Sequence, residues 1–361
     1  MAELLRLPAE KLYAEELEII RKEDTGAVPA GWAMSPRAVF TFIAGGMAGK
    51  KEILPKYIGN KRLIEMAIAT LVTDRALLLI GEPGTAKSTL SELLAAAIHG
   101  DSGKIIQGTA GTTEEQIRYS WNYAMLLANG PSRDALVKSP VYRAMETGTI
   151  ARFEEISRCP SEVQDALISI LSEKSMTIPE LGEEVSAVRG FSIIGTANTR
   201  DRGVNEMSSA LKRRFNILVL PAPGDIETEM DIVRKRVGEL SSQFQLQSEL
   251  PGEELVEKVV TIFRELRAGM TFDRKEKLKA PSGVISTAEA ISLLTNSMAL
   301  SGSFGSGRIT EEDVAAGLQG TIVKDEEKDR LVWKEYLENV MKKRGSGWRK
   351  LYLACSEMNQ A

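Results

Sequence analysis

The stretch Ala76-Leu-Leu-Leu-Ile-Gly-Glu-Pro-Gly-Thr-Ala-Lys-Ser-Thr89 decides the fold of this 361-residue chain. The apolar run over residues 76–80 predicts a buried strand, and the segment Thr89–Ile98 predicts a helix. Between them, Gly81-Glu-Pro-Gly-Thr-Ala-Lys-Ser88 matches the phosphate-binding pattern G-x-x-x-x-G-K-[ST] at every fixed position except Ala86. A loop of this kind between a strand and a helix predicts a nucleotide-phosphate site; a plain glycine-rich turn is the alternative.

The residue types in this loop suit the binding of ATP and Mg2+. Glycines let backbone N–H groups approach the phosphates, and the following helix adds the positive end of its dipole. We expect Lys87 to reach the β- and γ-phosphates and Ser88 to coordinate the metal. Ala86 replaces the second glycine of the pattern, so we expect it to keep helical backbone angles. The expected nucleotide contacts in the loop are Gly81, Glu82, Pro83, Gly84, Thr85, Ala86, Lys87, Ser88 and Thr89.

Strand and helix signals alternate from about Tyr57 to Pro223, which is typical of an α/β core whose parallel sheet is covered on both faces. Beyond that point only helical periods continue, which predicts a second, all-helical domain. The predicted domains are an N-terminal extension (1–50), an αβα core that holds the phosphate loop (51–222), and a helical domain with a C-terminal tail (223–361). The predicted elements are the helix Ala9–Glu23 in the extension, the strands Ala76–Ile80, Ile105–Gln107, Thr149–Phe153, Ser192–Thr196 and Ile217–Leu220 in the core, and the helices Ile226–Leu240, Glu253–Ala268, Thr287–Leu300, Thr310–Val323 and Glu327–Lys343 beyond it.

Two glutamates, Glu154 and Glu155, follow the third predicted strand. Ligands of a parallel sheet gather at the carboxyl ends of its strands, so these carboxylates should face the phosphates. We expect Glu154 to hold Mg2+ through the metal's water shell, and Glu155 to orient and polarise the water that attacks the γ-phosphate. Without the phosphate loop, a solvated pair of charges would be the simpler explanation.

Polar and basic residues at two further strand boundaries are candidates for completing the site. Asn198 follows the fourth predicted strand, where its side chain would point at the γ-phosphate; an Asx turn is the alternative. Arg213 and Arg214 close a helix just before the fifth strand. An arginine at that junction could reach the nucleotide of a neighbouring subunit as an arginine finger, although compensation of the helix dipole would also explain it.

The composition narrows the class of protein. Charged residues make up 27% of the chain and its net charge is −4, so no overall field would draw it to nucleic acid or to an anionic membrane. The single histidine and the two cysteines, Cys159 and Cys355, lack metal-ligand spacing, which argues against a zinc site. Two distant cysteines suit a reducing cytoplasm, and no apolar run reaches membrane-spanning length.

Together, these motifs resemble the AAA+ superfamily, and the region from Tyr57 to about Leu220 looks most like its MoxR branch. The resemblance rests on the stretches Ile58-Gly-Asn60, Gly81-Glu-Pro-Gly-Thr-Ala-Lys-Ser88, Ser161-Glu-Val-Gln-Asp-Ala-Leu-Ile168, Thr196-Ala-Asn-Thr199 and Arg213-Arg-Phe215. It implies that subunits form rings, commonly hexamers. It also implies client or partner proteins, which in that branch often carry von Willebrand factor A-like domains.

The same resemblance assigns roles to individual residues. Ile58 and Gly59 would lie near the adenine, and Asn198 would be the residue called sensor 1. Arg214, rather than Arg213, would be the arginine finger.

Two features of the sequence depart from a bare core of this type. In the helical region, Ala288 stands where relatives carry a second sensor arginine, which implies that another basic residue substitutes or that turnover is slow. The segment Gly108–Pro140 is longer than a simple crossover and is expected to hold an inserted hairpin. Its aromatic residues would either grip a polypeptide or simply pack: Tyr119, Trp121 and Tyr123.

Three functions are compatible with these residues. The first is an ATP-driven machine that remodels a partner protein, which the finger arginines and the helical domain favour. The second is a nucleic-acid-dependent ATPase, which the net acidity disfavours. The third is a nucleotide-gated regulatory scaffold with little turnover, which Ala288 and Glu154, standing where aspartate is more usual, would favour.

Overall fold

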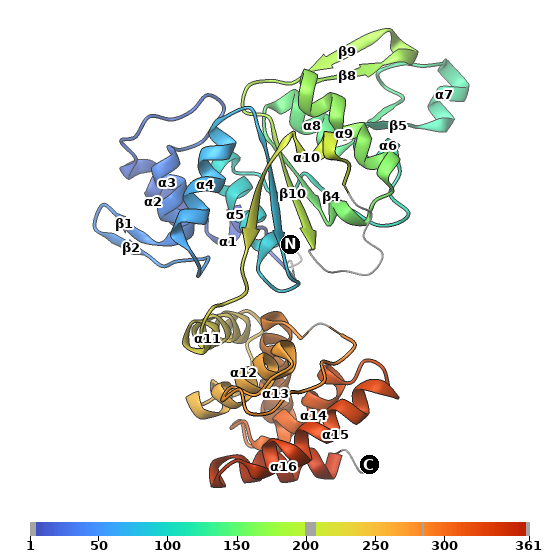
Figure 1. Cartoon of the computed structure of the whole chain (residues 1–361). Coiled ribbons are helices and arrows are strands. Elements are labelled where there is room, and N and C mark those ends of the chain that lie inside the picture. The colour runs from blue at the N-terminus through green and yellow to red at the C-terminus, as the bar shows by residue number, and fades with distance from the viewer. Residues whose placement is uncertain (1–4, 199–206, 284, 359–361) are drawn as a thin grey trace. The chain divides into compact units, whose positions relative to one another are not determined.

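The computed structural model describes most of the chain: residues 5–198, 207–283 and 285–358. The chain divides into two compact units (Figure 1): Met1–Glu82 with Ala86–Pro221, and Pro83–Thr85 with Ala222–Ala361. Thr199, the last residue of the stretch Thr196-Ala-Asn-Thr199, lies outside the described residues. So do the first four residues of the predicted extension and the last three of the predicted tail.

A parallel sheet forms the centre of the first unit, and its strand order is β11-β3-β10-β7-β4. The strands are β3 (Ala76–Gly81), β4 (Ile105–Gln107), β7 (Ile150–Glu154), β10 (Ser192–Asn198) and β11 (Phe215–Leu220). The three inner strands are almost entirely buried, as near-continuous apolar runs predict for parallel strands. The predicted fold class and all five predicted strands are therefore confirmed. Glu154 and Asn198, expected just beyond their strands, are the last residues of β7 and β10.

Helices cover both faces of this sheet (Figure 1). They are α4 (Lys61–Val72) and α5 (Lys87–His99) on one face, and α8 (Pro140–Thr147), α9 (Ser161–Glu173) and α10 (Ser209–Lys212) on the other. Successive side chains of a strand point to opposite faces, so Leu77 packs with α4 and α5 while Leu78 packs with α8 and α9. In β7 the same alternation directs Phe153 to the α8 and α9 face, which places Arg152 and Glu154 on the α5 face.

The N-terminal residues belong to the core of this unit. They form α1 (Ala9–Leu12), α2 (Ala14–Glu23), α3 (Pro36–Ala44), and an antiparallel hairpin of β1 (Gly46–Ala48) and β2 (Lys51–Ile53). The single predicted helix Ala9–Glu23 is interrupted at Tyr13, where φ and ψ are −112° and 27°. Phe42 of α3 is fully buried in the cluster that contains α4 and α5. Glu92 of α5 accepts a 3.1 Å hydrogen bond from the backbone N–H of Ala9, so α1 is anchored to the helix that follows the phosphate loop.

The expected insertion at Gly108–Pro140 does contain a hairpin. Its elements are α6 (Glu114–Ile117), β5 (Tyr119–Trp121), α7 (Tyr123–Asn129) and β6 (Leu136–Lys138), with β5 antiparallel to β6; a second antiparallel pair follows in β8 (Ser175–Ile178) and β9 (Glu183–Ser186). The rings of Tyr119 and Trp121 pack edge to face 5.9 Å apart, and the Tyr119 hydroxyl donates to Glu180. Ordinary packing therefore explains these two aromatics, whereas Tyr123 of α7 is 64% exposed.

The second unit is helical, as predicted. Its helices are α11 (Ile226–Gln243), α12 (Glu253–Ala268), α13 (Thr287–Phe304), α14 (Glu311–Ile322), α15 (Lys328–Asn339), η3 (Met341–Lys343) and α16 (Ser346–Met358). The predicted helix Glu327–Lys343 is divided between α15 and η3, and α16 was not predicted. Across the described parts of the chain, no helix combines the length and apolarity that crossing a bilayer requires.

A buried carboxylate ties three helices of this unit together. Glu229 of α11 is fully buried and accepts hydrogen bonds from Arg264 and Arg267 of α12 at 2.9 and 2.7 Å. The hydroxyl of Thr287, the first residue of α13, donates to the same carboxylate at 2.7 Å. A buried charge is tolerated only when it is paired and hydrogen-bonded, and Glu229 meets both conditions.

Candidate nucleotide-binding site

The carboxyl ends of the central strands meet at one edge of the sheet. Gly81, the last residue of β3, lies opposite Asn198, the last residue of β10. Glu154, the last residue of β7, lies opposite Gln107 of β4. The hydroxyl of Thr196 in β10 donates a 2.7 Å hydrogen bond to Glu154 Oε2, which joins β10 to β7. This edge is where ligands of open α/β sheets bind, and it brings together the predicted phosphate loop, acidic residue and sensor.

The phosphate loop connects β3 to α5, the arrangement that the pattern requires. Lys87, the first residue of α5, donates from Nζ to the backbone carbonyls of Gly81 and Glu82 at 3.0 and 2.8 Å. Its charged end therefore lies over the loop rather than out in solvent. Gly84 has a φ of 81°, a left-handed conformation that glycine adopts without steric cost.

Ala86 does not have the helical angles that we expected. It caps α5 with φ 60° and ψ 27°, which is the left-handed region. The turn from the loop into α5 imposes this conformation, which a glycine would accept freely and which alanine accepts only with strain. Glu155 is also left-handed, with φ 55° and ψ 43°, so two strained residues lie at this site.

Replacing Ala86 with glycine should stabilise the folded chain. Removing the methyl group relieves the left-handed strain, and we expect the free energy of unfolding to rise by about 1 kcal/mol. The measurement is the urea midpoint of the first unit's unfolding transition. Ala69→Gly, at an exposed position within α4, is the matched control and should lower stability by a similar amount, about 1 kcal/mol. Destabilisation by both variants would show that Ala86 is not strained.

Glu154 is the centre of a buried hydrogen-bond network. It is 3% exposed, and its Oε2 accepts from Ser88 Oγ at 2.7 Å as well as from Thr196. Its Oε1 accepts from Ser91 Oγ at 2.6 Å and from the Arg152 guanidinium at 2.9 Å. Ser88 and Glu154, predicted to share the metal, are thus in direct contact.

This network keeps Glu154 ionised. Burial raises its pKa, but the hydroxyls of Ser91, Ser88 and Thr196 and the charge of Arg152 together outweigh burial, so the pKa lies below its usual value. A charged carboxylate beside a serine hydroxyl is an oxygen-only donor pair, the chemistry that Mg2+ prefers. The residues present therefore fit a magnesium–nucleotide complex, with Ser88 and Glu154 as the groups that would hold the metal.

Glu155 is positioned by its backbone and paired through its side chain. Its N–H donates to Thr196 Oγ1 at 3.0 Å, which fixes it beside the Glu154 network. Its carboxylate forms a 2.5 Å ion pair with Arg158, three residues further along the chain, and the two side chains are 33% and 49% exposed. The predicted catalytic carboxylate is therefore accessible but already has a cationic partner.

The remaining predicted contact residues lie on segments other than the strands of the sheet. Ile58 and Gly59 lie between β2 and α4, where Ile58 is half-buried and Gly59 is exposed. Thr89 is exposed in the first turn of α5. Ala288 is exposed in the first turn of α13.

Arg213 and Arg214 lie at the opposite edge of the sheet from the phosphate loop. Phe215, which follows Arg214, pairs with Ala76 at the start of β3, whereas the loop follows Gly81 at its end. The length of β3 separates these edges by about 16 Å. Neither arginine is therefore placed beside the loop of its own chain.

The two arginines differ in how they are held. Arg214 is half-buried, and it donates from Nε to Ser172 Oγ at 2.8 Å and from Nη1 to the carbonyl of Ala210 at 2.6 Å. Arg213 is exposed. The guanidinium of Arg214 is thus oriented by α9 and α10, while the finger role itself stays a prediction.

Several residues of the network were not anticipated from the sequence. Arg152, Ser91 and Thr196 surround Glu154, and Arg158 pairs with Glu155. One signal was available: Arg152 is a charged residue inside an otherwise apolar strand, and a charge in such a position needs a partner.

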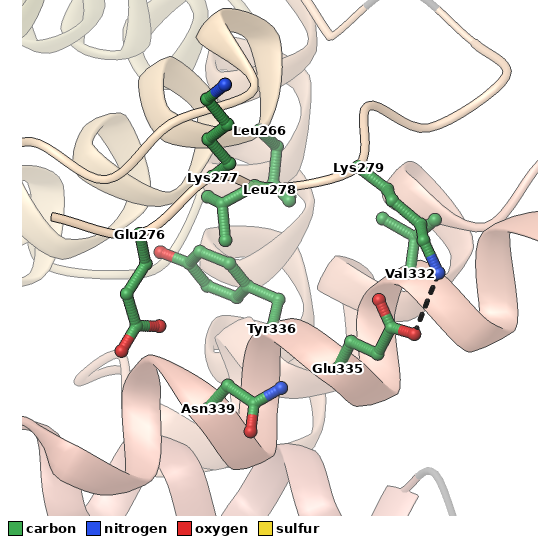
Figure 2. A pocket seen from close by; sticks show the side chains of 9 residues that line it. All are labelled: Leu266, Glu276, Lys277, Leu278, Lys279, Val332, Glu335, Tyr336 and Asn339. Atoms are coloured by element: carbon green, nitrogen blue, oxygen red, sulfur yellow. Dashed lines mark hydrogen bonds and ion pairs between the residues drawn. The ribbon is translucent and has the colours of Figure 1, made fainter. Parts of the chain in front are cut away.

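The second unit has a pocket of its own. Its volume is about 220 Å3, and it lies between the segment 276–279 and α15, with Leu266 of α12 also in its wall. Figure 2 shows the side chains that line it, with the 3.0 Å ion pair between Lys279 and Glu335. The Tyr336 ring forms part of the lining, and its hydroxyl donates to the buried Glu265.

Comparisons with known proteins match both units. Residues 76–215 match the family described as AAA domain (dynein-related subfamily), and residues 227–360 match the YehL-like AAA+ ATPase C-terminal domain. The uncharacterized protein YehL of Escherichia coli (strain K12) is 44% identical over 356 residues, which cover 97% of each chain. The uncharacterized protein YojN of Bacillus subtilis (strain 168) is 28% identical over 201 residues, 55% of this chain and 61% of its own.

Among solved structures, NtrX from Brucella abortus in complex with ATP aligns with a TM-score of 0.50 and 14% identity, covering 96% of this chain and 72% of that one. At this identity the alignment supports the fold alone. YehL, which is similar over nearly its full length, and the two family matches identify the family as well as the fold. The chain belongs to the AAA+ ATPase family, in its dynein-related, MoxR-like branch, and it carries the C-terminal domain of the YehL-like members.

Proposed function

We propose that this chain binds Mg2+-ATP at the carboxyl edge of its sheet and hydrolyses it between the subunits of a ring. The observation that carries this proposal is the 2.7 Å hydrogen bond between Ser88 Oγ and Glu154 Oε2, with Glu155 as the next residue. It joins the hydroxyl proposed to bind the metal to the acidic strand end, and a structural turn has no need of that contact.

Each residue has a defined task in this mechanism. Lys87 supplies positive charge beside the phosphates, and Ser88 and Glu154 hold the metal, which when bound neutralises charge on the phosphate oxygens. Glu155 orients a water molecule and draws on its proton as the water oxygen forms a bond to the γ-phosphorus. The bond from that phosphorus to the bridging oxygen breaks, releasing ADP and phosphate. Asn198 would contact the attacking water.

We propose that Arg214 completes the site of a neighbouring subunit, since its own phosphate loop lies at the other edge of the sheet. A ring, with six subunits as in much of the family, would supply that neighbour. Residues 51–222 would be the ATPase core, with Ile58 and Gly59 near the adenine, and residues 223–361 the helical lid domain that responds to hydrolysis.

The work done would be the remodelling or assembly of a partner protein, with a von Willebrand factor A-like domain as one candidate feature of that partner. Helix α7 in the insertion supports a protein client, because none of its residues is buried and Leu127 is 87% exposed. The thiols of Cys159 and Cys355 are buried and unbridged, which suits the cytoplasm.

A nucleotide-gated switch with little turnover is the second candidate. Two observations favour it: Arg158 already pairs with the Glu155 carboxylate, and Ala288 stands at the expected second sensor position. Under this alternative, nucleotide binding would set the conformation and hydrolysis would only reset it.

Single-turnover hydrolysis, with protein in excess over radiolabelled ATP, tests both candidates. We expect Mg2+-dependent release of phosphate by the unmodified chain and a fall of at least about 100-fold in Lys87→Ala, because the ammonium beside the phosphates is lost. Lys138→Ala, which removes a charge from the exposed pair with Glu146, should match the unmodified chain. Binding without hydrolysis would favour the switch, and absence of both would refute the proposed function.

A further inference from the structure

Arg152 occupies a place where a charged residue needs a reason. It lies in the middle of β7, is only 6% exposed, and points to the face covered by α5. Its guanidinium donates to Ser91 Oγ at 2.9 Å, to Glu154 Oε1 at 2.9 Å, and to the carbonyls of Ser88 and Ser102 at 3.0 and 3.2 Å. All three of its nitrogens are therefore used at one point beneath the phosphate loop.

These contacts divide the two oxygens of Glu154 between separate tasks. Arg152 and Ser91 both contact Oε1. Oε2 is left to Ser88 and Thr196, and therefore faces the hydroxyl expected to bind the metal. A serine that gives a lone pair to a metal can still donate its proton to Oε2, so this arrangement is compatible with an occupied site.

The length of the Glu154 side chain explains why the contacts of Arg152 and Ser91 with Oε1 are useful. Compared with an aspartate, a glutamate has one more rotatable bond, so its carboxylate has more positions to sample. Holding Oε1 with a guanidinium and a hydroxyl removes that freedom and fixes the direction of Oε2. Groups that orient a metal ligand from behind typically change metal affinity 10- to 100-fold when they are removed.

We propose that Arg152 is a positioning residue for the metal site: it grips one oxygen of Glu154 so that the other is presented to Ser88 and the metal. This inference rests on the proposed function, because it requires a magnesium–nucleotide complex at Ser88. It also implies that Glu154 and Arg152 form a matched pair. Shortening Glu154 to the aspartate more usual at this position should therefore weaken the site.

A purely structural role for Arg152 makes a different prediction. Its bonds to the carbonyls of Ser88 and Ser102 also tie α5 and the segment after it to β7. If this tie were its only task, its loss would lower stability or weaken nucleotide binding whether or not a metal is present. A change confined to the metal-dependent part of binding separates the two roles.

The test is the affinity of the full chain for a fluorescent ATP analogue, measured by titration in Mg2+ and again in EDTA. We expect Arg152→Gln and Glu154→Asp each to reduce the Mg2+ enhancement of affinity by about 10- to 100-fold while affinity in EDTA stays within about threefold. The Mg2+ enhancement of the double variant should be no smaller than that of the more strongly affected single variant, because both changes break the same contact. Arg133→Gln, which loses the same charge from an exposed ion pair with Glu183, should retain the full enhancement.

Three results would overturn this assignment. They are an unchanged Mg2+ enhancement in Arg152→Gln, an equal loss of affinity in Mg2+ and in EDTA, and additive losses in the double variant. Should Arg152→Gln not fold, Glu154→Asp and Arg152→Lys decide, since both should lose part of the enhancement. If the unmodified chain itself shows no Mg2+-dependent binding, the proposed function fails, which is a distinct result.

Discussion

Glu155→Gln is expected to bind ATP with nearly unchanged affinity and to hydrolyse it about 100- to 10,000-fold more slowly, the range over which a positioned general base contributes. The amide keeps the shape of the carboxylate but cannot draw a proton from water. The backbone contact of Glu155 with Thr196 does not involve the side chain, so the fold of the site should survive. The measurement is single-turnover phosphate release beside an equilibrium binding titration.

Glu162→Gln is the matched control for this variant. Glu162 is exposed in the first turn of α9, close to Glu155 in the chain, and its neutralisation should leave turnover unchanged. Turnover in Glu155→Gln equal to that of the control would remove Glu155 from the mechanism, whatever the binding result.

Arg214→Ala should lose about 1,000-fold or more in hydrolysis while it retains ATP binding, as expected when an arginine finger is removed. Arg214 lies at the edge of the sheet opposite its own phosphate loop, so its loss should spare the loop of the same chain. Its guanidinium is oriented by Ser172 and Ala210, which lowers the cost of placing it against a neighbour's phosphate.

Arg213→Ala is the comparison that decides between the two adjacent arginines. Arg213 is exposed, and its removal should reduce hydrolysis much less. The opposite ranking, with Arg213→Ala inactive and Arg214→Ala active, would transfer the finger role to Arg213. Full activity in both variants would argue against an arginine finger in this segment.

Much of the fold could be predicted because local patterns and tertiary packing agree. Buried parallel strands require near-continuous apolar runs, and β3, β7 and β10 have them. The helix α12 was predicted with the correct bounds, since its apolar residues recur with helical spacing and Gly269 follows its end. By contrast, α16 was missed because the basic stretch Lys342–Lys350 hides where its apolar face begins.

The individual residues of the site could be predicted, but the contacts between their side chains could not. The loop pattern identified Lys87 and Ser88, and strand ends identified Glu154 and Asn198, because these depend on sequence order alone. That Ser88 and Ser91 would contact Glu154 and Arg152 depends on α5 covering that face of β7, which a single sequence does not specify.

Backbone conformation was the other feature of the site that the sequence did not predict. The left-handed angles of Ala86 are imposed by the path of the loop into α5, against the local preference of alanine for the right-handed region. Residue preference alone predicts right-handed angles at this position. Such conflicts between local preference and tertiary structure concentrate at functional sites.

Subunit mixing tests the central claim, a hydrolytic site shared between neighbouring chains, most directly. Glu155→Gln chains retain the arginine and Arg214→Ala chains retain the carboxylate, so a mixed assembly contains some interfaces with both. We predict that equal mixing of the two inactive variants restores about a quarter of the unmodified activity, since a random ring pairs the intact halves at that frequency. Hydrolysis by the mixture that stays at the level of the separate variants would contradict a shared site.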